Sequence, residues 1–242
     1  MNWASIASQI LLRWLQAISL GWMISVKLLE SDDKIIRVEL EGVPLSVANA
    51  IRRFTINEVP TMAVEEILII ENTSAMPNDV LAHRISLIPF KSDIDRYVPP
   101  EECDCGSRLG CDRCAVRYIL RAEAKDEPIT VYSGDMIPED PTTTAKPVSP
   151  KIPIVKLAPG QRIEMELYVR VGRGRKNAKW QAAISSLYEP KDGDPNKRIL
   201  YVESIGFLPP KRILIEAAKA LEKKTSEFEE KFSKLLEELK AN

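Results

Sequence analysis

Histidine is almost missing from this chain, since its 242 residues include only one. That scarcity argues against a metal site built on several imidazoles and against a cysteine–histidine catalytic network. An excess of positive charge is missing too, because 34 lysines and arginines face 35 acidic residues. A protein whose whole surface binds nucleic acid is thereby excluded, because such binding needs surplus cations to displace counterions.

The usual signatures of an enzyme are also lacking. The sequence contains no phosphate-binding loop, no nucleophile elbow and no cluster of three aspartates that could hold two magnesium ions. What the chain does have is 45% hydrophobic residues, enough to bury one large core or two small ones. We therefore expect a folded protein that is not an enzyme on its own.

Residues 1–22 form a separate, mostly apolar segment whose only charge is Arg13. A membrane span of about 20 apolar residues would not carry an embedded arginine and two glutamines. A signal peptide would need a positive start and a small-residue cleavage site, and neither is clear. The segment is interpreted as an extension from a mis-assigned start, with Met23 as the first residue. A partner-docking amphipathic helix and a membrane anchor are the alternatives, and we expect a cytoplasmic protein without membrane contact.

From Met23 onward, short strands and helices follow one another. Two β-rich runs at 24–30 and 34–41 flank Ser31-Asp32-Asp33 and predict a hairpin. Ser46 is expected to cap a helix over 47–58 that ends before Pro60. Further strands are expected at 62–72, 116–124, 129–133, 162–172 and 197–206, with a helical turn around 77–90. This mixture predicts an α+β fold.

The last helix is expected to run from Pro210 to about Leu239 with apolar residues at three- and four-residue steps. Helices average 11–12 residues, so one of about 30 must extend beyond its own small domain. Its outer half carries a narrow apolar seam between charged flanks. We expect a partner helix to cover that seam; the alternative is a free, partly frayed terminal helix. The seam residues expected to bind the partner are Leu221, Phe228, Phe232 and Leu235.

All four cysteines fall within twelve residues, as Cys103-Asp-Cys105 and Cys111-Asp-Arg-Cys114. Two close pairs separated by a turn with two glycines suit a tetrahedral ion, because each pair can span one edge of the tetrahedron. No further ligand nearby suggests an open catalytic position, so one structural zinc ion is expected. Disulfides, free thiols and an iron–sulfur cluster are the alternatives, although the bacterial ferredoxin spacing is absent.

A basic run follows the strand at 162–172 and consists of Arg170, Arg173, Arg175, Lys176 and Lys179. It is either a patch for a protein or phosphate partner or a solvated loop. Together with the cysteines it supports a rival interpretation, a metal-containing nucleic-acid-binding module whose affinity for DNA would depend on salt.

Four motifs in order resemble one protein family. The segment LEGVPLSVANAIRRFTINEVPTMAVEEILIIENTS resembles the amino-terminal core of the alpha-like subunits of cellular RNA polymerases. Its Asn49–Arg53 and Glu58–Pro60 match the hallmark of that family, and the closest likeness is to the archaeal D subunit and its eukaryotic counterpart. LAHRISLIPF and GRGRKNAKWQAA resemble two further family elements, and the cysteine loop looks like the eukaryotic zinc loop with a longer spacer. Residues 1–22 have no counterpart.

The resemblance implies a discontinuous dimerisation domain, residues 23–60 and 188–242, around a mostly β insert domain, residues 61–187, which carries the cysteine loop 103–114. It implies pairing with the small alpha-like subunit L, and assembly with the second-largest catalytic subunit and the small subunits N and P. DNA would be reached only through the holoenzyme. By motif match, Asn49, Arg52 and Arg53 would face the assembly surface. Some relatives carry an extra iron–sulfur insertion; this chain has no cysteines for it, so no cluster is expected.

Overall fold

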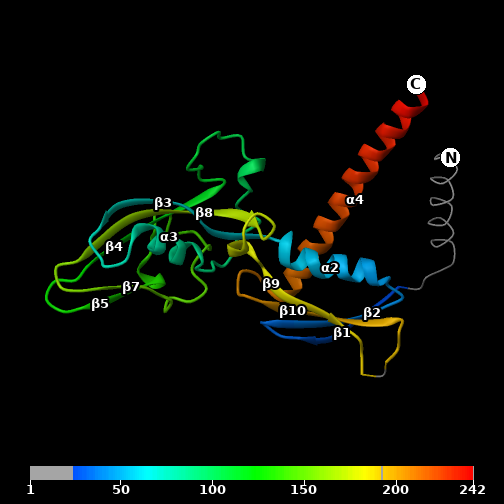
Figure 1. Ribbon diagram of the computed structural model, residues 1–242, viewed down its shortest axis with the longest axis horizontal. Coiled ribbons are helices and arrows are strands. Elements are labelled where there is room, and N and C mark those ends of the chain that lie inside the picture. Colours follow the sequence, from blue (N-terminus) through cyan, green and yellow to red (C-terminus); the bar gives the residue numbers. More distant parts are fainter. Residues whose placement is uncertain (1–23, 192, 242) are drawn as a thin grey trace.

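The computed structural model describes residues 24–191 and 193–241, so the predicted extension 1–22 lies outside the described residues. The described chain has two parts that lie end to end, each with its own β-sheet (Figure 1). Two separate clusters of buried apolar residues correspond to these parts. We call them the helix-bearing unit and the β-rich unit.

The helix-bearing unit consists of one four-stranded antiparallel sheet and two helices. Its strands are β1 (Ser25–Ser31), β2 (Ile35–Glu41), β9 (Ala183–Tyr188) and β10 (Lys197–Ser204), in the order β1-β2-β10-β9. Helices α2 (Leu45–Asn57) and α4 (Pro210–Ala241) pack against each other and against this sheet. The core between them contains Ile36, Val38, Leu40, Leu200, Val202, Ile213 and Ala217.

The predicted hairpin at the start of this unit is confirmed. Strands β1 and β2 pair antiparallel, and Oδ1 of Asp32 accepts hydrogen bonds of 2.7 Å from the amides of Lys34 and Ile35. These two amides hold the pKa of the Asp32 carboxyl below its ordinary value. An aspartate that satisfies the turn amides is a common way to close a tight connection.

The predicted cap of the first helix is wrong. Helix α2 begins at Leu45 after Pro44, whose extended backbone starts the helix, and no side chain caps it. Ser46 therefore lies inside the first turn. The buried residues of α2 are Ala48 and Thr55, whereas Val47 is exposed. The packing of α2 against α4 and β9 determines which of its residues are buried.

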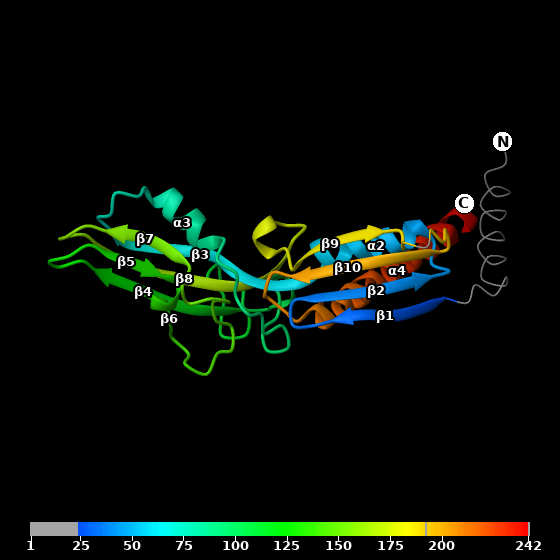
Figure 2. The same cartoon turned by 90° about the horizontal axis from the view of Figure 1, so that it is seen from below.

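The β-rich unit is built on a second antiparallel sheet in the order β3-β8-β4-β6. Its strands are β3 (Pro60–Asn72), β8 (Arg162–Arg173), β4 (Ala115–Glu123) and β6 (Ile137–Pro138). A small sheet of β5 (Ile129–Tyr132) and β7 (Pro153–Leu157), with helix α3 (Asn78–Ser86), covers one face (Figure 2). Ile163, Met165, Leu167 and Val169 alternate along β8 and are buried, as period-two burial on one sheet face requires.

The α+β fold class is confirmed, with mostly β structure in the unit that carries the cysteines. The predicted division at residues 60/61 and 187/188 stays a prediction. Sheet pairing nevertheless places β9, which the sequence had assigned to the insert range, beside β10 in the helix-bearing unit. Pro60 likewise already pairs with Arg173 in the β-rich sheet. Within the described residues, none of the helices combines the length and apolar character that a bilayer crossing requires.

Candidate metal centre and docking face

The cysteine loop leads from the short 3-10 turn η1 (Pro100–Glu102) into strand β4. Gly106 and Gly110 have φ of 60° and 88°, a backbone conformation that favours glycine. They allow the chain to reverse between the two cysteine pairs, as the sequence predicted. The amides of Cys114 and Ala115 then donate to the carbonyl of Cys111, which closes the second pair in a tight turn.

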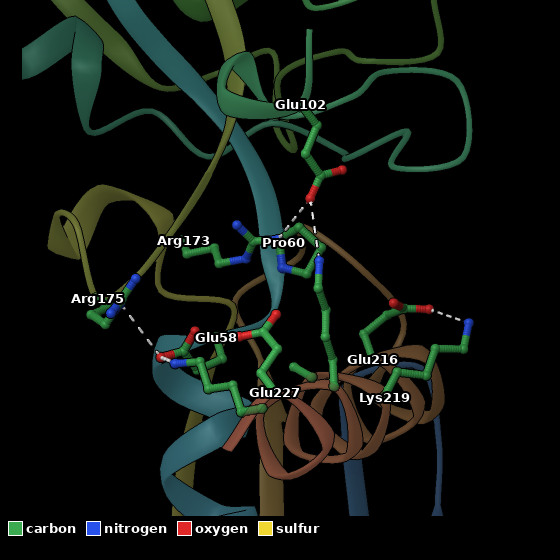
Figure 3. Close-up of a pocket in the computed structure, with 11 residues that line it drawn as sticks. Glu58, Pro60, Glu102, Arg173, Arg175, Glu216, Lys219 and Glu227 are labelled. Atoms are coloured by element: carbon green, nitrogen blue, oxygen red, sulfur yellow. Dashed lines mark hydrogen bonds and ion pairs between the residues drawn. The ribbon is translucent and has the colours of Figure 1, made fainter. Parts of the chain in front are cut away.

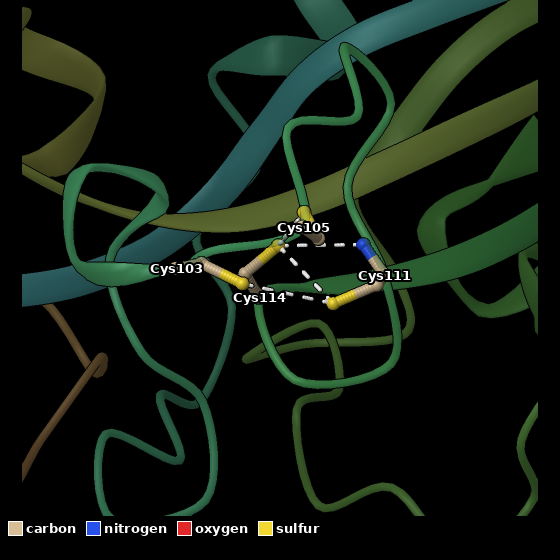
Figure 4. A group of neighbouring side chains, drawn as sticks. All are labelled: Cys103, Cys105, Cys111 and Cys114. Atoms are coloured by element: carbon tan, nitrogen blue, oxygen red, sulfur yellow. Dashed lines mark hydrogen bonds between the residues drawn. The ribbon is translucent and has the colours of Figure 1, made fainter.

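The loop brings the four thiols together (Figure 4). All four Sγ atoms lie within 4.8 Å of one another. The Sγ separations are 3.7 Å for Cys103–Cys111, 3.8 Å for Cys105–Cys114 and 3.9 Å for Cys111–Cys114. A zinc–sulfur bond of about 2.3 Å places the corners of a tetrahedron about 3.8 Å apart. The four sulfurs therefore fit one tetrahedral metal ion.

The environment of the thiols is uneven. A hydrogen bond from the backbone N–H of Arg113 lowers the pKa of Cys111 to about 7. Burial raises the pKa of Cys114 to about 12, although the amide of Cys111 donates to its sulfur over 3.3 Å. A bound cation would favour the ionised form of all four thiols.

The basic run does not form a free cationic patch. Nζ of Lys179 lies 2.5 Å from a carboxylate oxygen of Glu65, and Nζ of Lys176 lies 3.3 Å from the other. Both ammonium groups also face the ring of Trp180. Among the described residues each of these two cations thus has an acidic partner. This arrangement weakens the rival interpretation as a nucleic-acid-binding module.

A cleft of about 330 Å³ lies between α4, the end of α2 and the turn η1 that precedes the cysteine loop (Figure 3). Both signs of charge line it. The buried carboxylate of Glu58 lies 2.5 Å from Nζ of Lys224 on α4 and 3.6 Å from Nε of Arg175. Glu102, directly before Cys103, lies 3.9 Å from Arg173 and 3.8 Å from Lys223. These ion pairs connect the two units.

The predicted partner-binding seam lies on the half of α4 that projects from the body (Figure 1). Every residue from Thr225 to Leu239 is exposed, and Phe228 and Phe232 stack with ring centroids 5.8 Å apart. Phe228 is 68% exposed, whereas Leu221, nearer the body, is half-buried. We call the surface of Phe228, Phe232, Leu235, Leu236 and Leu239 the distal seam.

The three predicted assembly residues lie elsewhere, on α2. Asn49 and Arg53 are exposed and one turn apart, and Nε of Arg52 donates to Oδ1 of Asn49 over 2.9 Å. The hydrogen bond holds the side chain of Arg52 against the helix. The structure thus separates the predicted residues into a metal group, a helix-end group and an α2 group.

Sequence reasoning missed one apolar surface, the edge strand β1. Val26 and Leu28 stand opposite Leu40 and Val38 in the antiparallel register and so point to the same face of the sheet. Leu40 and Val38 are buried, yet Val26 is 64% exposed. Among the described residues the helices make their main sheet contacts with β2, β9 and β10. Alternation in the sequence predicts which face is apolar, but not whether anything covers it.

Comparison with known proteins relates the chain to transcription. The family profile described as "RNA polymerase Rpb3/RpoA insert domain" matches residues 65–187. DNA-directed RNA polymerase subunit Rpo3 of Pyrobaculum neutrophilum is 41% identical over 166 residues, 69% of this chain and 62% of that protein. The Rpo3 proteins of Methanosphaera stadtmanae and Pyrococcus horikoshii are 41% and 43% identical over 68% and 67% of this chain, and 60% and 58% of their own lengths.

The chain thus spans about 60% of the length of the curated relatives it matches. The motifs in the sequence predicted the archaeal D subunit as the closest likeness. That name is wrong, because the relatives carry the name Rpo3; the alpha-like counterpart is the same. The profile covers half of the chain, and its residues contain the cysteine loop and all of the β-rich sheet except the start of β3. The chain belongs to the RNA polymerase Rpb3/RpoA insert-domain family.

Proposed function

We propose that this chain is a non-catalytic assembly subunit of a DNA-directed RNA polymerase, which pairs with a small alpha-like subunit through α4. The observation that carries the proposal is the distal seam, an exposed apolar stripe on a helix that extends beyond its own core. A stripe of this kind is stable in water mainly when a second helix covers it. The names of the relatives support a polymerase as the context.

The proposed partners are those of an assembly platform. The small alpha-like subunit L would cover the distal seam, and the second-largest catalytic subunit would meet Asn49, Arg52 and Arg53 on α2. The small subunits N and P would join the same assembly, and DNA would be contacted only through the holoenzyme. The exposure of Asn49 and Arg53 supports this role. A preformed pair lowers the entropic cost of assembling several large subunits, because two of them have already lost their independent translation and rotation.

We further propose that Cys103, Cys105, Cys111 and Cys114 hold one structural zinc ion. Three Sγ–Sγ separations between 3.7 and 3.9 Å, with all four sulfurs within 4.8 Å of one another, support a single tetrahedral ion. They are far longer than the 2.05 Å of a disulfide, and four sulfurs within 4.8 Å leave no room for a cluster of several irons. A bound zinc ion would supply cross-links that order a loop with few apolar residues.

The pairing proposal is tested by truncation. A chain ending after Glu222 lacks the whole distal seam and should no longer co-purify with its cognate small alpha-like subunit. The β-rich unit should stay folded, because its buried cluster contains no residue of α4. The control is a chain that starts at Met23 and keeps α4. Co-purification of the truncated chain at the level of the parent would overturn the proposal.

The zinc proposal is tested by elemental analysis of the purified chain. Cys103→Ser and Cys111→Ser should each lower the zinc content measured by atomic emission, because serine does not replace a thiolate ligand. Ser107→Ala, in the same loop, is the matched control and should leave it unchanged. An unchanged zinc content in both cysteine variants contradicts the metal assignment.

A further inference from the structure

One arginine of the basic run does not end at a carboxylate. Arg170, on β8, is only 8% exposed, and its Nη2 donates a hydrogen bond to the carbonyl oxygen of Arg108 inside the cysteine loop. Its register neighbours on β3 and β4 are Ala63 and Ala115, which leave space for a long side chain between the strands. Among the described residues no carboxylate lies within ion-pair distance of it.

A buried cation without a carboxylate partner is unfavourable, because removing its charge from water costs free energy that only nearby negative charge can offset. The Nε of Arg170 is also buried and has no hydrogen-bond partner among the described groups. The energetic balance of this arginine therefore requires a source of negative charge close by.

With the proposed zinc ion bound, the cysteine loop would supply that charge. A Cβ atom placed on Gly110 would lie 3.2 Å from Nη2 of Arg170 and 3.2 Å from Sγ of Cys114. The guanidinium and the sulfur therefore approach the same point, and their separation cannot exceed twice that distance. The same Cβ would lie 2.7 Å from Cβ of Ala115, which is too close for a side chain, so position 110 requires glycine. One divalent zinc ion with four thiolates carries a net charge of −2.

We propose that Arg170 is a positioning residue of the metal centre, which holds the Arg108–Gly110 turn and balances the negative charge of the four thiolates. The inference rests on the proposed zinc site. Hydrogen bonds from outside the ligand shell orient the ligands of many metal sites, and their loss typically weakens metal binding about 10- to 100-fold. Here the group that does so comes from the central sheet of the β-rich unit rather than from the loop itself.

The experiment measures the affinity of the full chain for Zn²⁺ by competition with a chromogenic chelator. Arg170→Met keeps the length of the side chain but removes its charge and its donors, and should weaken Zn²⁺ binding about 10- to 100-fold. Arg170→Lys keeps a positive charge without the planar fork and should weaken it less. Arg162→Met, at the far end of the same strand, removes an exposed arginine and should bind Zn²⁺ as the parent does.

Circular dichroism establishes which variants fold. If Arg170→Met does not fold, the Zn²⁺ affinity of Arg170→Lys alone tests the inference. A folded Arg170 variant that binds Zn²⁺ as tightly as Arg162→Met overturns the inference and leaves the zinc site standing. A parent chain that takes up no Zn²⁺ overturns both. Weaker binding by the folded Arg170 variants, with an unchanged ratio of one ion per chain at saturation, supports the inference.

Discussion

The two units of this protein differ in how completely they bury their apolar residues. In the β-rich unit, Tyr118, Leu120 and Leu167 on the central strands are fully buried under α3 and the small sheet. In the helix-bearing unit, the outer half of α4 and the edge strand β1 leave large apolar side chains in water. The difference supports the proposal that a second chain covers the helix-bearing unit, whereas the β-rich unit buries its core with its own elements.

The size of this difference follows from burial. Covering one exposed leucine or phenylalanine contributes about 1.5–3 kcal/mol. The distal seam has five such residues, so a partner helix can gain substantial free energy there even after the loss of side-chain freedom. Substitutions in the two units should therefore change different quantities, stability in one and association in the other.

The largest expected effect is on the closed core. Leu167→Ala removes a fully buried side chain from the centre of β8 and should lower the free energy of unfolding of the β-rich unit by about 2–5 kcal/mol. Leu68→Ala on the neighbouring strand is the control, since Leu68 is exposed. Chemical denaturation measures both, and equal losses would contradict the assignment of a closed core.

The second-largest effect is expected at the distal seam. Replacing Phe228 and Phe232 together by alanine should leave the unfolding of the free chain almost unchanged, because both side chains are exposed. The affinity for the small alpha-like subunit should fall by about 2–4 kcal/mol, as expected for aromatic anchors at an interface. Calorimetric titration measures the affinity, and Lys231→Ala on the same helix is the control. A large loss of stability in the free chain would show that this face is already covered.

A smaller effect is expected where the units meet. Glu58→Gln removes the carboxylate that faces Lys224 and Arg175 and should destabilise the packing of α4 by about 1 kcal/mol, because both cations are partly solvated. Hydrogen exchange of the first turns of α4 reports this loss. Glu227→Gln in the same cleft is the control and should leave exchange unchanged. Equal hydrogen exchange in the two variants would show that Glu58 does not stabilise the contact between the units.

The smallest effect depends on pH. Burial raises the pKa of Glu65, but the hydrogen bond and charge of Lys179, with Lys176, outweigh it and hold the pKa below the ordinary value of 4.5. The carboxylate therefore stabilises the fold above its unfolded pKa, and that contribution is lost as the pH falls through the folded pKa. Glu65→Gln should be less stable than the parent at neutral pH and equal to it in stronger acid.

Thermal unfolding across pH 2–7 measures the difference in stability between Glu65→Gln and the parent at each pH. Glu127→Gln, in an exposed loop, is the control and should follow the parent throughout. A gap between Glu65→Gln and the parent that widens in acid would contradict the sign.

Much of the fold was predictable because its signals are local. The hairpin at Asp32, the alternation of β8 and the long periodic α4 each depend on neighbouring residues, and all three are present. Strand β9 was missed because Ala183–Tyr188 has little β character of its own. Its pairing with β10, including the hydroxyl of Ser185 that donates to the carbonyl of Tyr201, makes it a strand.

The candidate site divides in the same way. The spacing of Cys103, Cys105, Cys111 and Cys114 predicts a four-thiol group, because the ligands lie within one loop. The role of Arg170 could not be predicted, since its partner Arg108 lies 62 positions away and only the sheet brings them together. The sequence left the basic run open between a partner patch and a solvated loop, and in the structure Glu65, more than 100 positions away, pairs with two of its lysines.

Local chemistry by itself determined the cysteine loop, the periodic helix and the alternating strands, because each needs only a few consecutive residues. The tertiary structure alone decided which apolar faces stay open and which charges meet. Val26 and Leu28 carry the same pattern as buried strand residues, and only the position of α2 and α4 leaves them in water. Burial depends on what covers a surface, and that is set by contacts between distant parts of the chain.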